Sequence, residues 1–239
     1  MKNSGKTASL LKLMIRGNVG GQRRVANTAG LSPEMRLLRQ FQADRLKTTY
    51  ADLAASARYG RVTQFFLSDI YGAKDFSQRD ADAEEVYNAM RQYLPDRLLT
   101  TMGQAVTLNR LTQELDEKML HVLCRELGMA GELTPEMYVA AYRLLDNYDE
   151  RSHQIDLVLE IGRSVDHLTR IPMIGLILKA AGRPARRAGW AELHDFLERG
   201  FHTFKQMGGA AEFLSIVEQR ERRILDQIFA GNPRPFAVS

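Results

Sequence analysis

The stretch that decides the fold is DRLLTTMGQAVTLNRLTQELDEKMLHVLCRELG, residues 96–128. Its apolar side chains recur every three or four residues, which is the spacing of one face of an α-helix. The apolar positions are Leu99, Met102, Val106, Leu111, Leu115, Met119, Val122 and Leu123. Pro95 before the stretch and Gly128 at its end are helix boundary signals. We therefore predict one long helix over about 96–127.

Helical spacing continues on both sides of this stretch. Ser32-Pro33-Glu34 and Thr134-Pro135-Glu136 each combine an N-cap residue with a proline at the first helical position. Further helices are predicted over about 32–53, 60–71, 77–94, 134–148, 148–169, 190–207 and 210–229. MIGLILKAAG, residues 173–182, is apolar nearly all round and predicts a buried helix after Pro172, and GRPARRAG, residues 182–189, predicts a basic loop. No segment alternates with period two between turn signals. The predicted fold is all-α, a single multi-helix bundle of about eight helices.

Charge divides the chain into a leader and a body. Residues 1–31 carry six of the 33 Lys and Arg residues and no Asp or Glu, whereas the remaining basic residues nearly balance the 29 acidic ones. A basic segment rich in Gly, Ser and Asn cannot bury much surface, so we predict a flexible, disordered leader over 1–31. The helical domain is then 32–230, with a possible subdomain seam near 128–134, and 231–239 is a short tail. Nucleic-acid binding is not expected of the body, only of the leader with the basic 182–189 segment.

The composition also bears on location. No apolar run approaches the roughly 18 residues that span a bilayer, so a transmembrane protein is not expected. The single cysteine, Cys124, excludes an intrachain disulfide and favours a reducing, cytoplasmic location.

Histidines and acidic residues offer weak metal candidates. Glu150 and His153 have the Glu-x-x-His spacing of di-iron helical bundles, but such bundles need two copies of this pair and the chain has one. His121 lies beside the apolar stripe of the long helix and is the best candidate for an axial haem ligand. No cofactor is predicted, and haem or iron remain alternatives.

A second histidine pattern lies near the C-terminus. His194, Glu198 and His202 are spaced by four residues, and at 100° per residue they rotate from the edge of the apolar face toward solvent. We interpret this row as solvated, with a metal or an intersubunit contact as the alternative.

FFLSDIYGAKDFSQRDAD, residues 65–82, concentrates charge around a predicted helix end at Gly72. We expect the two phenylalanines to anchor the helix in the core. Arg79 then either pairs with a nearby carboxylate to fix the corner or binds an anionic group in a pocket. The candidate ligand-binding or structural residues of this polar corner are Asp69, Tyr71, Asp75, Arg79 and Asp80.

This stretch resembles a signature, roughly FFLxDLYGxxDFxxRD, of an uncharacterised family of bacterial all-helical proteins. RLKTTYADLAAS, LLTTMGQAVTLNRLTQELD and GFHTFKQMGGAAEFLSIVEQRERRIL also fit the family, so the resemblance spans about 32–229. Ile70 stands where the signature has leucine. The resemblance implies a bacterial, cytoplasmic, all-helical protein and no particular activity, substrate or cofactor.

No CxxC, HExxH or GxSxG motif occurs in the chain. We therefore expect a non-enzymatic helical module that binds a partner protein or a small apolar or anionic ligand. The alternative is a haem- or metal-binding redox or sensor protein, or an enzyme, that uses scattered histidines and acidic residues. A homo-oligomer is compatible with either.

Overall fold

The computed structural model describes residues 30–71, 82–83 and 96–238. Within these ranges it contains nine α-helices, one π-helical segment and no strand, which confirms the all-α prediction. The elements are α2 (Pro33–Thr49), α3 (Ala51–Ala55), α4 (Gly60–Phe65), η1 (Phe66–Ile70), α6 (Asp96–Arg125), α7 (Pro135–Leu145), α8 (Tyr148–Thr169), α9 (Pro172–Ala188), α10 (Ala191–Met207) and α11 (Ala211–Phe229). No helix of this described part is long and apolar enough to cross a membrane.

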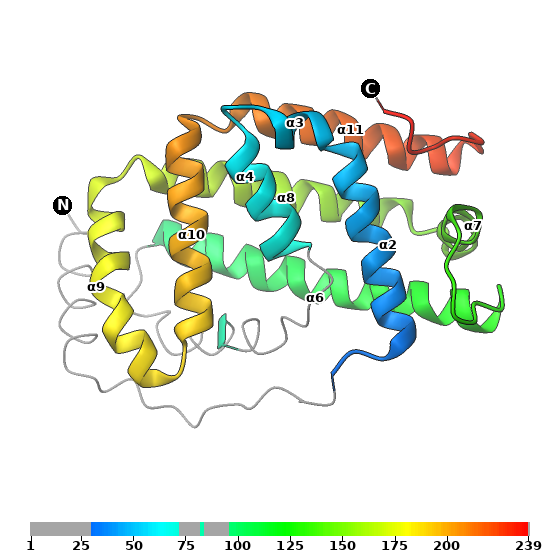
Figure 1. The fold of residues 1–239 in the computed structure, drawn as a ribbon, viewed down its shortest axis with the longest axis horizontal. Coiled ribbons are helices and arrows are strands. Elements are labelled where there is room, and N and C mark those ends of the chain that lie inside the picture. Colours follow the sequence, from blue (N-terminus) through cyan, green and yellow to red (C-terminus); the bar gives the residue numbers. More distant parts are fainter. Residues whose placement is uncertain (1–29, 72–81, 84–95, 239) are drawn as a thin grey trace.

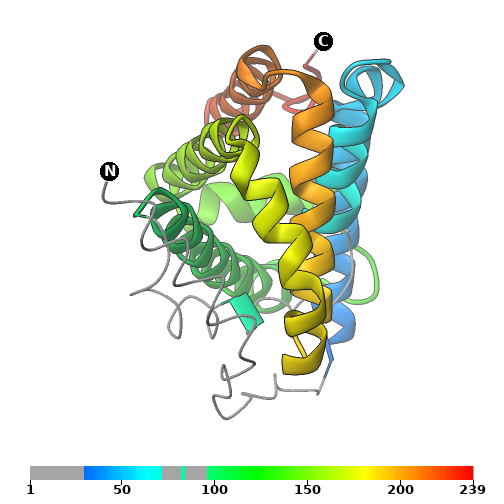
Figure 2. The same ribbon diagram turned by 90° about the vertical axis from the view of Figure 1, so that its left-hand side faces the viewer.

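The helices form two layers that cross each other. The three long helices α6, α8 and α11 lie side by side in one layer (Figure 1). Helices α2, α4, α10 and α9 run steeply across them, and Figure 2 shows the long helices nearly end-on beside this second layer. Helix α7 closes one end by packing on α6 and α11. Side chains that face the space between the layers therefore come from segments far apart in sequence.

The predicted capping signals determine where two helices begin. The Ser32 hydroxyl accepts a hydrogen bond from the Met35 amide at 3.1 Å, and the Thr134 hydroxyl accepts one from the Met137 amide at 3.3 Å. Each cap satisfies an amide that has no partner within its own helix. These starts depend on a few neighbouring residues, which is why the sequence predicts them well.

The core consists of two groups of buried side chains. One group joins α2 and α4 to α8, α10 and α11, and the other joins α2 to α6, α7 and α11. Helices α2 and α11 contribute to both groups, with Leu46 and Val217 in the first and Leu38 and Leu225 in the second. The candidate site described below lies where the two groups meet.

The prediction for the segment after Pro172 is wrong in two respects. Helix α9 does not stop at Gly182 but continues through Pro184 to Ala188, where Gly189 ends it with φ of 84°. The helix is also not buried, because Leu176 is 68% and Met173 48% exposed. Among the described elements α9 packs against α10 and α8, and Leu176 and Met173 lie on the part of its surface that stays exposed.

Smaller differences concern the first helices. The segment predicted as one helix over 32–53 divides at Tyr50 into α2 and α3. Phe65 is buried as expected, but Phe66 is only half-buried. The predicted cap at Gly72, most of the helix over 77–94 and nearly all of the leader lie outside the described residues.

Candidate functional site

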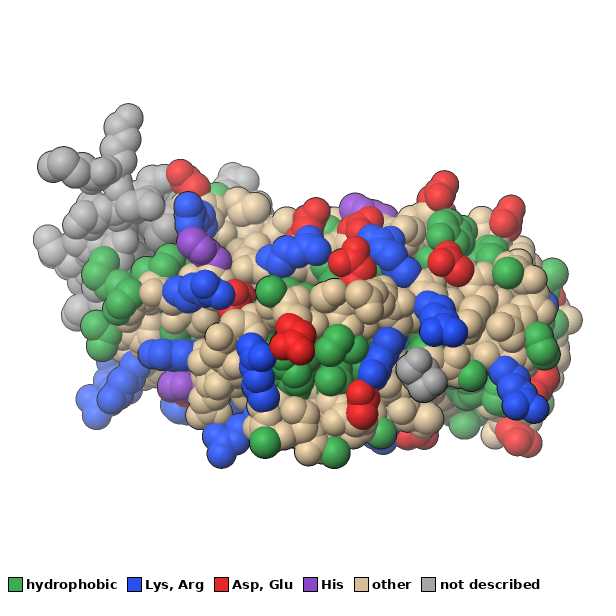
Figure 3. All heavy atoms as spheres, turned by 90° about the horizontal axis from the view of Figure 1, so that it is seen from above, with side chains coloured by type: hydrophobic (Ala, Val, Ile, Leu, Met, Phe, Trp, Pro, Cys, Tyr) green, Lys and Arg blue, Asp and Glu red, His purple; other side chains and the backbone are tan. Residues whose placement is uncertain are grey.

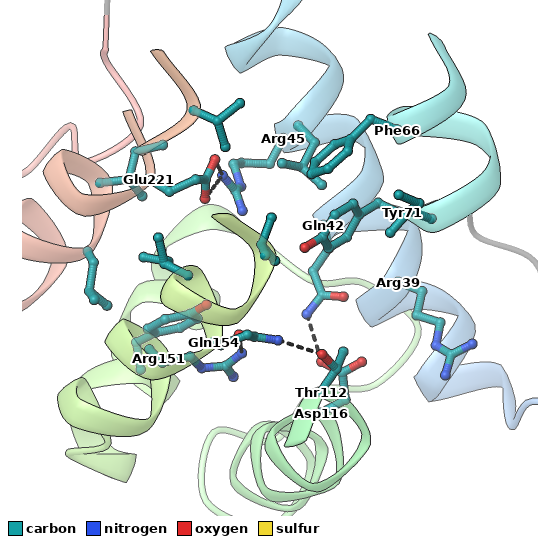
Figure 4. A pocket seen from close by; sticks show the side chains of 18 of the residues that line it. Arg39, Gln42, Arg45, Phe66, Tyr71, Thr112, Asp116, Arg151, Gln154 and Glu221 are labelled. Atoms are coloured by element: carbon teal, nitrogen blue, oxygen red, sulfur yellow. Dashed lines mark hydrogen bonds and ion pairs between the residues drawn. The ribbon is translucent and has the colours of Figure 1, made fainter. Parts of the chain in front are cut away.

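A cavity of about 170 Å³ lies between the two helix layers, where α2 crosses α6, α8 and α11 (Figure 4). Its described lining includes charged and polar side chains from α2, α6, α7, α8 and α11, together with Tyr50 at the end of α2 and Tyr71 at the end of η1. These are Arg39, Gln42, Arg45, Tyr50, Tyr71, Asn109, Thr112, Gln113, Asp116, Tyr138, Tyr142, Arg151, Gln154 and Glu221. Polar groups shielded from water are costly unless they are hydrogen-bonded, so the partners of each charged group decide what the cavity can do.

Arg45 and Glu221 form a closed ion pair at one side of the cavity. The Arg45 Nη1 donates to both carboxylate oxygens of Glu221, at 2.7 and 2.8 Å, and the Tyr50 hydroxyl donates to the same carboxylate at 2.8 Å. Burial works against the charge of Arg45, but the Glu221 carboxylate outweighs it and raises the pKa of the guanidinium. Burial, with the Glu221 charge, raises the pKa of Tyr50 and keeps its proton in place. This group is electrically balanced without a ligand.

Asp116 is a buried acid on the opposite side. Gln42 donates to its Oδ1 from Nε2 at 3.0 Å, which Figure 4 shows reaching across from α2 to α6. Burial raises the pKa of Asp116, whereas the Gln42 hydrogen bond and the charge of Arg151 oppose that shift. The carboxyl group therefore takes up a proton more readily than an exposed aspartate does.

Arg151 is a buried charge of the cavity that has no hydrogen-bonded carboxylate among the described residues. Its side chain comes from the first turns of α8 and the residue is 5% exposed. Nη1 donates to Gln154 at 3.3 Å and Nη2 to the Leu115 carbonyl at a long 3.5 Å, both neutral acceptors. Nε has no hydrogen-bond partner. The guanidinium also lies over the Tyr142 ring, 4.6 Å from its centre. An arginine that is buried without a bonded carboxylate is a candidate anion-binding group.

A π-helical turn shapes the wall formed by η1. The Tyr71 amide donates to the Phe66 carbonyl at 3.1 Å, five residues back, in place of the usual four. The two rings lie together, with centroids 5.0 Å apart, and both line the cavity. Burial raises the pKa of Tyr71, so its hydroxyl stays protonated. Single π-turns inside α-helices occur frequently at functional sites.

The size and lining of the cavity limit its contents. An engineered cavity of about 150 Å³ in another protein holds benzene, so a volume near 170 Å³ suits a ligand of similar size. Pockets for drug-sized ligands measure roughly 300–1,000 Å³, and haem is larger than most such ligands. The apolar part of the lining comes largely from α8 and α11, the helices that also carry Arg151 and Glu221, with Ile155, Val158, Val217, Ile224, Leu225 and Ile228.

The structure separates the two described residues of the predicted polar corner. Asp69 accepts hydrogen bonds from Arg199 of α10 at 3.1 and 2.5 Å, away from the cavity. Tyr71, two residues later, lines the cavity instead. Residues two apart on a helix face different sides, which accounts for the divergence. Asp75, Arg79 and Asp80 lie outside the described residues, so the proposed role of Arg79 stays a prediction.

The candidate metal ligands occupy different environments. His121, Glu150 and His153 are all exposed, and no histidine belongs to the described lining of the cavity. His202 is exposed as expected, but His194 is buried, which contradicts the expectation of a solvated row. His194 is covered because α9 packs against α10 at this point, and a count of angles along α10 alone does not include that neighbour.

Sequence reasoning missed Arg45, Asp116, Arg151 and Glu221, the four charged residues that dominate the cavity. A usable signal was present for Arg151, which shares a helical face with Ile155 and Val158. A charged residue inside an apolar stripe is a buried polar group and a candidate for function.

The chain is therefore an all-α protein in which two crossed layers of helices hold a charged cavity between them. The chain belongs to the family described as Domain of unknown function (DUF8198), whose model matches residues 22–235. This confirms the resemblance to an uncharacterised domain family, while its bacterial origin and signature motif stay predictions. The match begins inside the predicted leader. Neither a curated protein nor a solved structure matches the chain.

Proposed function

We propose that the protein binds a small organic anion, a carboxylate with an apolar part, in the cavity between its helix layers. The observation that carries the proposal is the buried guanidinium of Arg151, whose bonded partners are neutral and whose Nε has none. A guanidinium presents its donors in a planar fork that matches the two oxygens of a carboxylate.

The other charges of the cavity support one added negative charge. Arg45 and Glu221 neutralise each other, and the Asp116 carboxylate influences Arg151 through its charge but makes no hydrogen bond to it. Binding one anion beside Arg151 therefore offsets a cost that the empty cavity carries. Tyr71 and Tyr142 also line the cavity, and their hydroxyl groups provide further donors.

The apolar wall supports a ligand that has a hydrocarbon portion. Branched aliphatic side chains of α8 and α11 line the cavity beside the charged groups that the same helices carry. A short aliphatic or aromatic acid places its carboxylate at Arg151 and its hydrocarbon part against this wall. Inorganic phosphate has no hydrocarbon part that could contact this wall.

Paired probes test the proposal. Thermal unfolding and calorimetric titration compare benzoate with benzamide and hexanoate with hexanamide, pairs of nearly the same size that differ in charge and in the NH2 donor of the amide. We expect the acids to bind and the amides to bind at least tenfold more weakly, because charge-assisted hydrogen bonds contribute about 1.5–3 kcal/mol. Equal affinity of acid and amide contradicts the proposal.

Variants locate the binding. Arg151→Met keeps the length of the side chain and replaces a buried charge with an apolar group, a change that folded proteins often tolerate. It should abolish the preference for the acids. Arg163→Met on the same helix is the control, because Arg163 is exposed and pairs with Glu218 at 3.6 Å. Unchanged acid binding in Arg151→Met rules out Arg151 as the anchor.

The remaining expectations are proposals of the same kind. A cytoplasmic location is supported by Cys124, the chain's single cysteine.

A protein partner or a second copy of the chain is supported by the exposed Leu176 and Met173 of α9. Nucleic-acid binding has less support, since Figure 3 shows basic and acidic side chains interleaved over one face. Sedimentation of the purified chain checks its oligomeric state. A haem or metal-centred redox protein or enzyme ranks second to anion binding.

A further inference from the structure

We propose that His194, Asp195 and Glu198 of α10 bind a divalent transition-metal ion of the zinc type. Within the described residues, one ligand atom from each of the three lies within 4.8 Å of the others. This site is separate from the charged cavity, because none of its three residues lines that cavity. Failure of one proposal therefore leaves the other standing.

The hydrogen bond of His194 fixes which ring nitrogen carries the proton. The ring is buried, with the residue 5% exposed, and Nε2 lies 2.9 Å from the carbonyl oxygen of Leu178 on α9. A carbonyl oxygen only accepts, so Nε2 must hold a hydrogen and donate it. In the neutral ring Nδ1 then carries a lone pair. That lone pair faces the Asp195 carboxylate, with Nδ1 3.4 Å from Oδ1.

A neutral Nδ1 and a carboxylate oxygen are both acceptors and do not attract each other. Two arrangements resolve this conflict: a second proton on the ring, or a cation that both atoms coordinate. Metal-binding histidines commonly donate their other ring N–H to a backbone carbonyl, which orients the ring. The bond from Nε2 to Leu178 is of this kind.

Packing holds the ring in place. A methyl group added at Gly182 of α9 would lie 3.2 Å from the His194 Cε1, so the ring fits closely against this glycine. The side chain therefore has little freedom to turn Nδ1 away from Asp195. A preorganised ligand loses less entropy on binding a metal than a mobile one.

The spacing of the ligands suits a small ion. Two ligands about 2.1 Å from a tetrahedral zinc lie roughly 3.4 Å apart, and the Nδ1 to Oδ1 distance is 3.4 Å. Glu198, one helical turn beyond His194, completes three protein ligands. One nitrogen with two carboxylate oxygens is a donor set that zinc accepts, with water in the fourth position.

One nearby cation competes with the metal. The Arg186 Nη1 lies 3.6 Å from the Asp195 Oδ1, and its side chain is 56% exposed. A pair this exposed contributes little to stability, so the guanidinium can move away when a metal enters. Removing its charge should make the site more attractive to a cation.

Titration with zinc and cobalt tests the site on the full chain after chelator treatment. Calorimetry should detect one zinc per chain, and Co²⁺ should give visible absorption with intensity typical of tetrahedral coordination. Asp195→Asn and Glu198→Gln keep the shape of each side chain and should each weaken binding at least tenfold. His202→Ala, an exposed histidine on the same helix, is the control and should change nothing. Arg186→Gln should bind zinc more tightly.

Two results overturn the proposal. The first is no zinc binding at millimolar concentration, and the second is binding that Asp195→Asn and Glu198→Gln leave unchanged.

Discussion

Replacing Glu221 with leucine removes the carboxylate that balances Arg45 at the cavity. The pair is mostly shielded, since the side chains are 14% and 18% exposed. Removing one partner of a buried ion pair costs about 3–5 kcal/mol, and the Tyr50 hydroxyl also loses its acceptor. Because both side chains keep some contact with solvent, we expect a loss in the free energy of unfolding of about 3–4 kcal/mol, in the lower part of that range.

The double variant Arg45→Met with Glu221→Leu separates a charge effect from a packing effect. It removes both charges and leaves no buried ion without a partner, so it should recover to within about 1.5 kcal/mol of the original protein. Asp52→Asn is the control, because it breaks an ion pair with equally short hydrogen bonds that is exposed to solvent. Arg220 binds Asp52 through two hydrogen bonds of 2.7 Å and lowers the pKa of Asp52 to about 2, yet the Asp52 side chain is 60% exposed. Its loss should cost less than about 1 kcal/mol at neutral pH.

Urea unfolding followed by circular dichroism at 222 nm measures all four proteins. The free energy of unfolding should fall with urea concentration at the same slope in all of them, so that a shift of the midpoint reports a change in stability. A loss below about 1 kcal/mol in Glu221→Leu refutes the view that burial sets the strength of this pair. A double variant that is no more stable than Glu221→Leu alone refutes the charge explanation.

Two further predictions follow from the packing and the cavity. Gly162→Ala should lower the free energy of unfolding by about 1–2 kcal/mol, because the new methyl would lie 2.6 Å from the Leu214 Cδ2 of α11. Adding Leu214→Val should restore part of that loss in the same urea assay, and no loss in the single variant would contradict the close approach of α8 and α11. Asp116→Asn removes a negative charge near Arg151 and should tighten benzoate binding at pH 7 about fivefold, roughly 1 kcal/mol. Because burial raises the pKa of Asp116, the original protein gains a proton there as the pH falls. The difference in calorimetric affinity between the two proteins should therefore shrink toward acidic pH, and a constant difference would contradict the raised pKa.

The sequence by itself determined the elements that depend on near neighbours along the chain. These signals involve residues that lie at most a few helical turns apart, namely the caps at Ser32 and Thr134 and the apolar repeat of 96–127. The structure has α2, α7 and α6 at these places. Helix boundaries follow from local hydrogen bonds and backbone preferences, which the same few residues supply in any fold.

Only the tertiary structure decided which faces are covered and which charges meet. His194 is buried because α9 packs on α10, whereas Leu176 of α9 is exposed. Arg45 and Glu221 are 176 positions apart and meet because α2 crosses α11. Burial, pKa and ion pairing depend on neighbours brought together by the crossing angle of helices. Periodicity along a single helix contains no information on that angle.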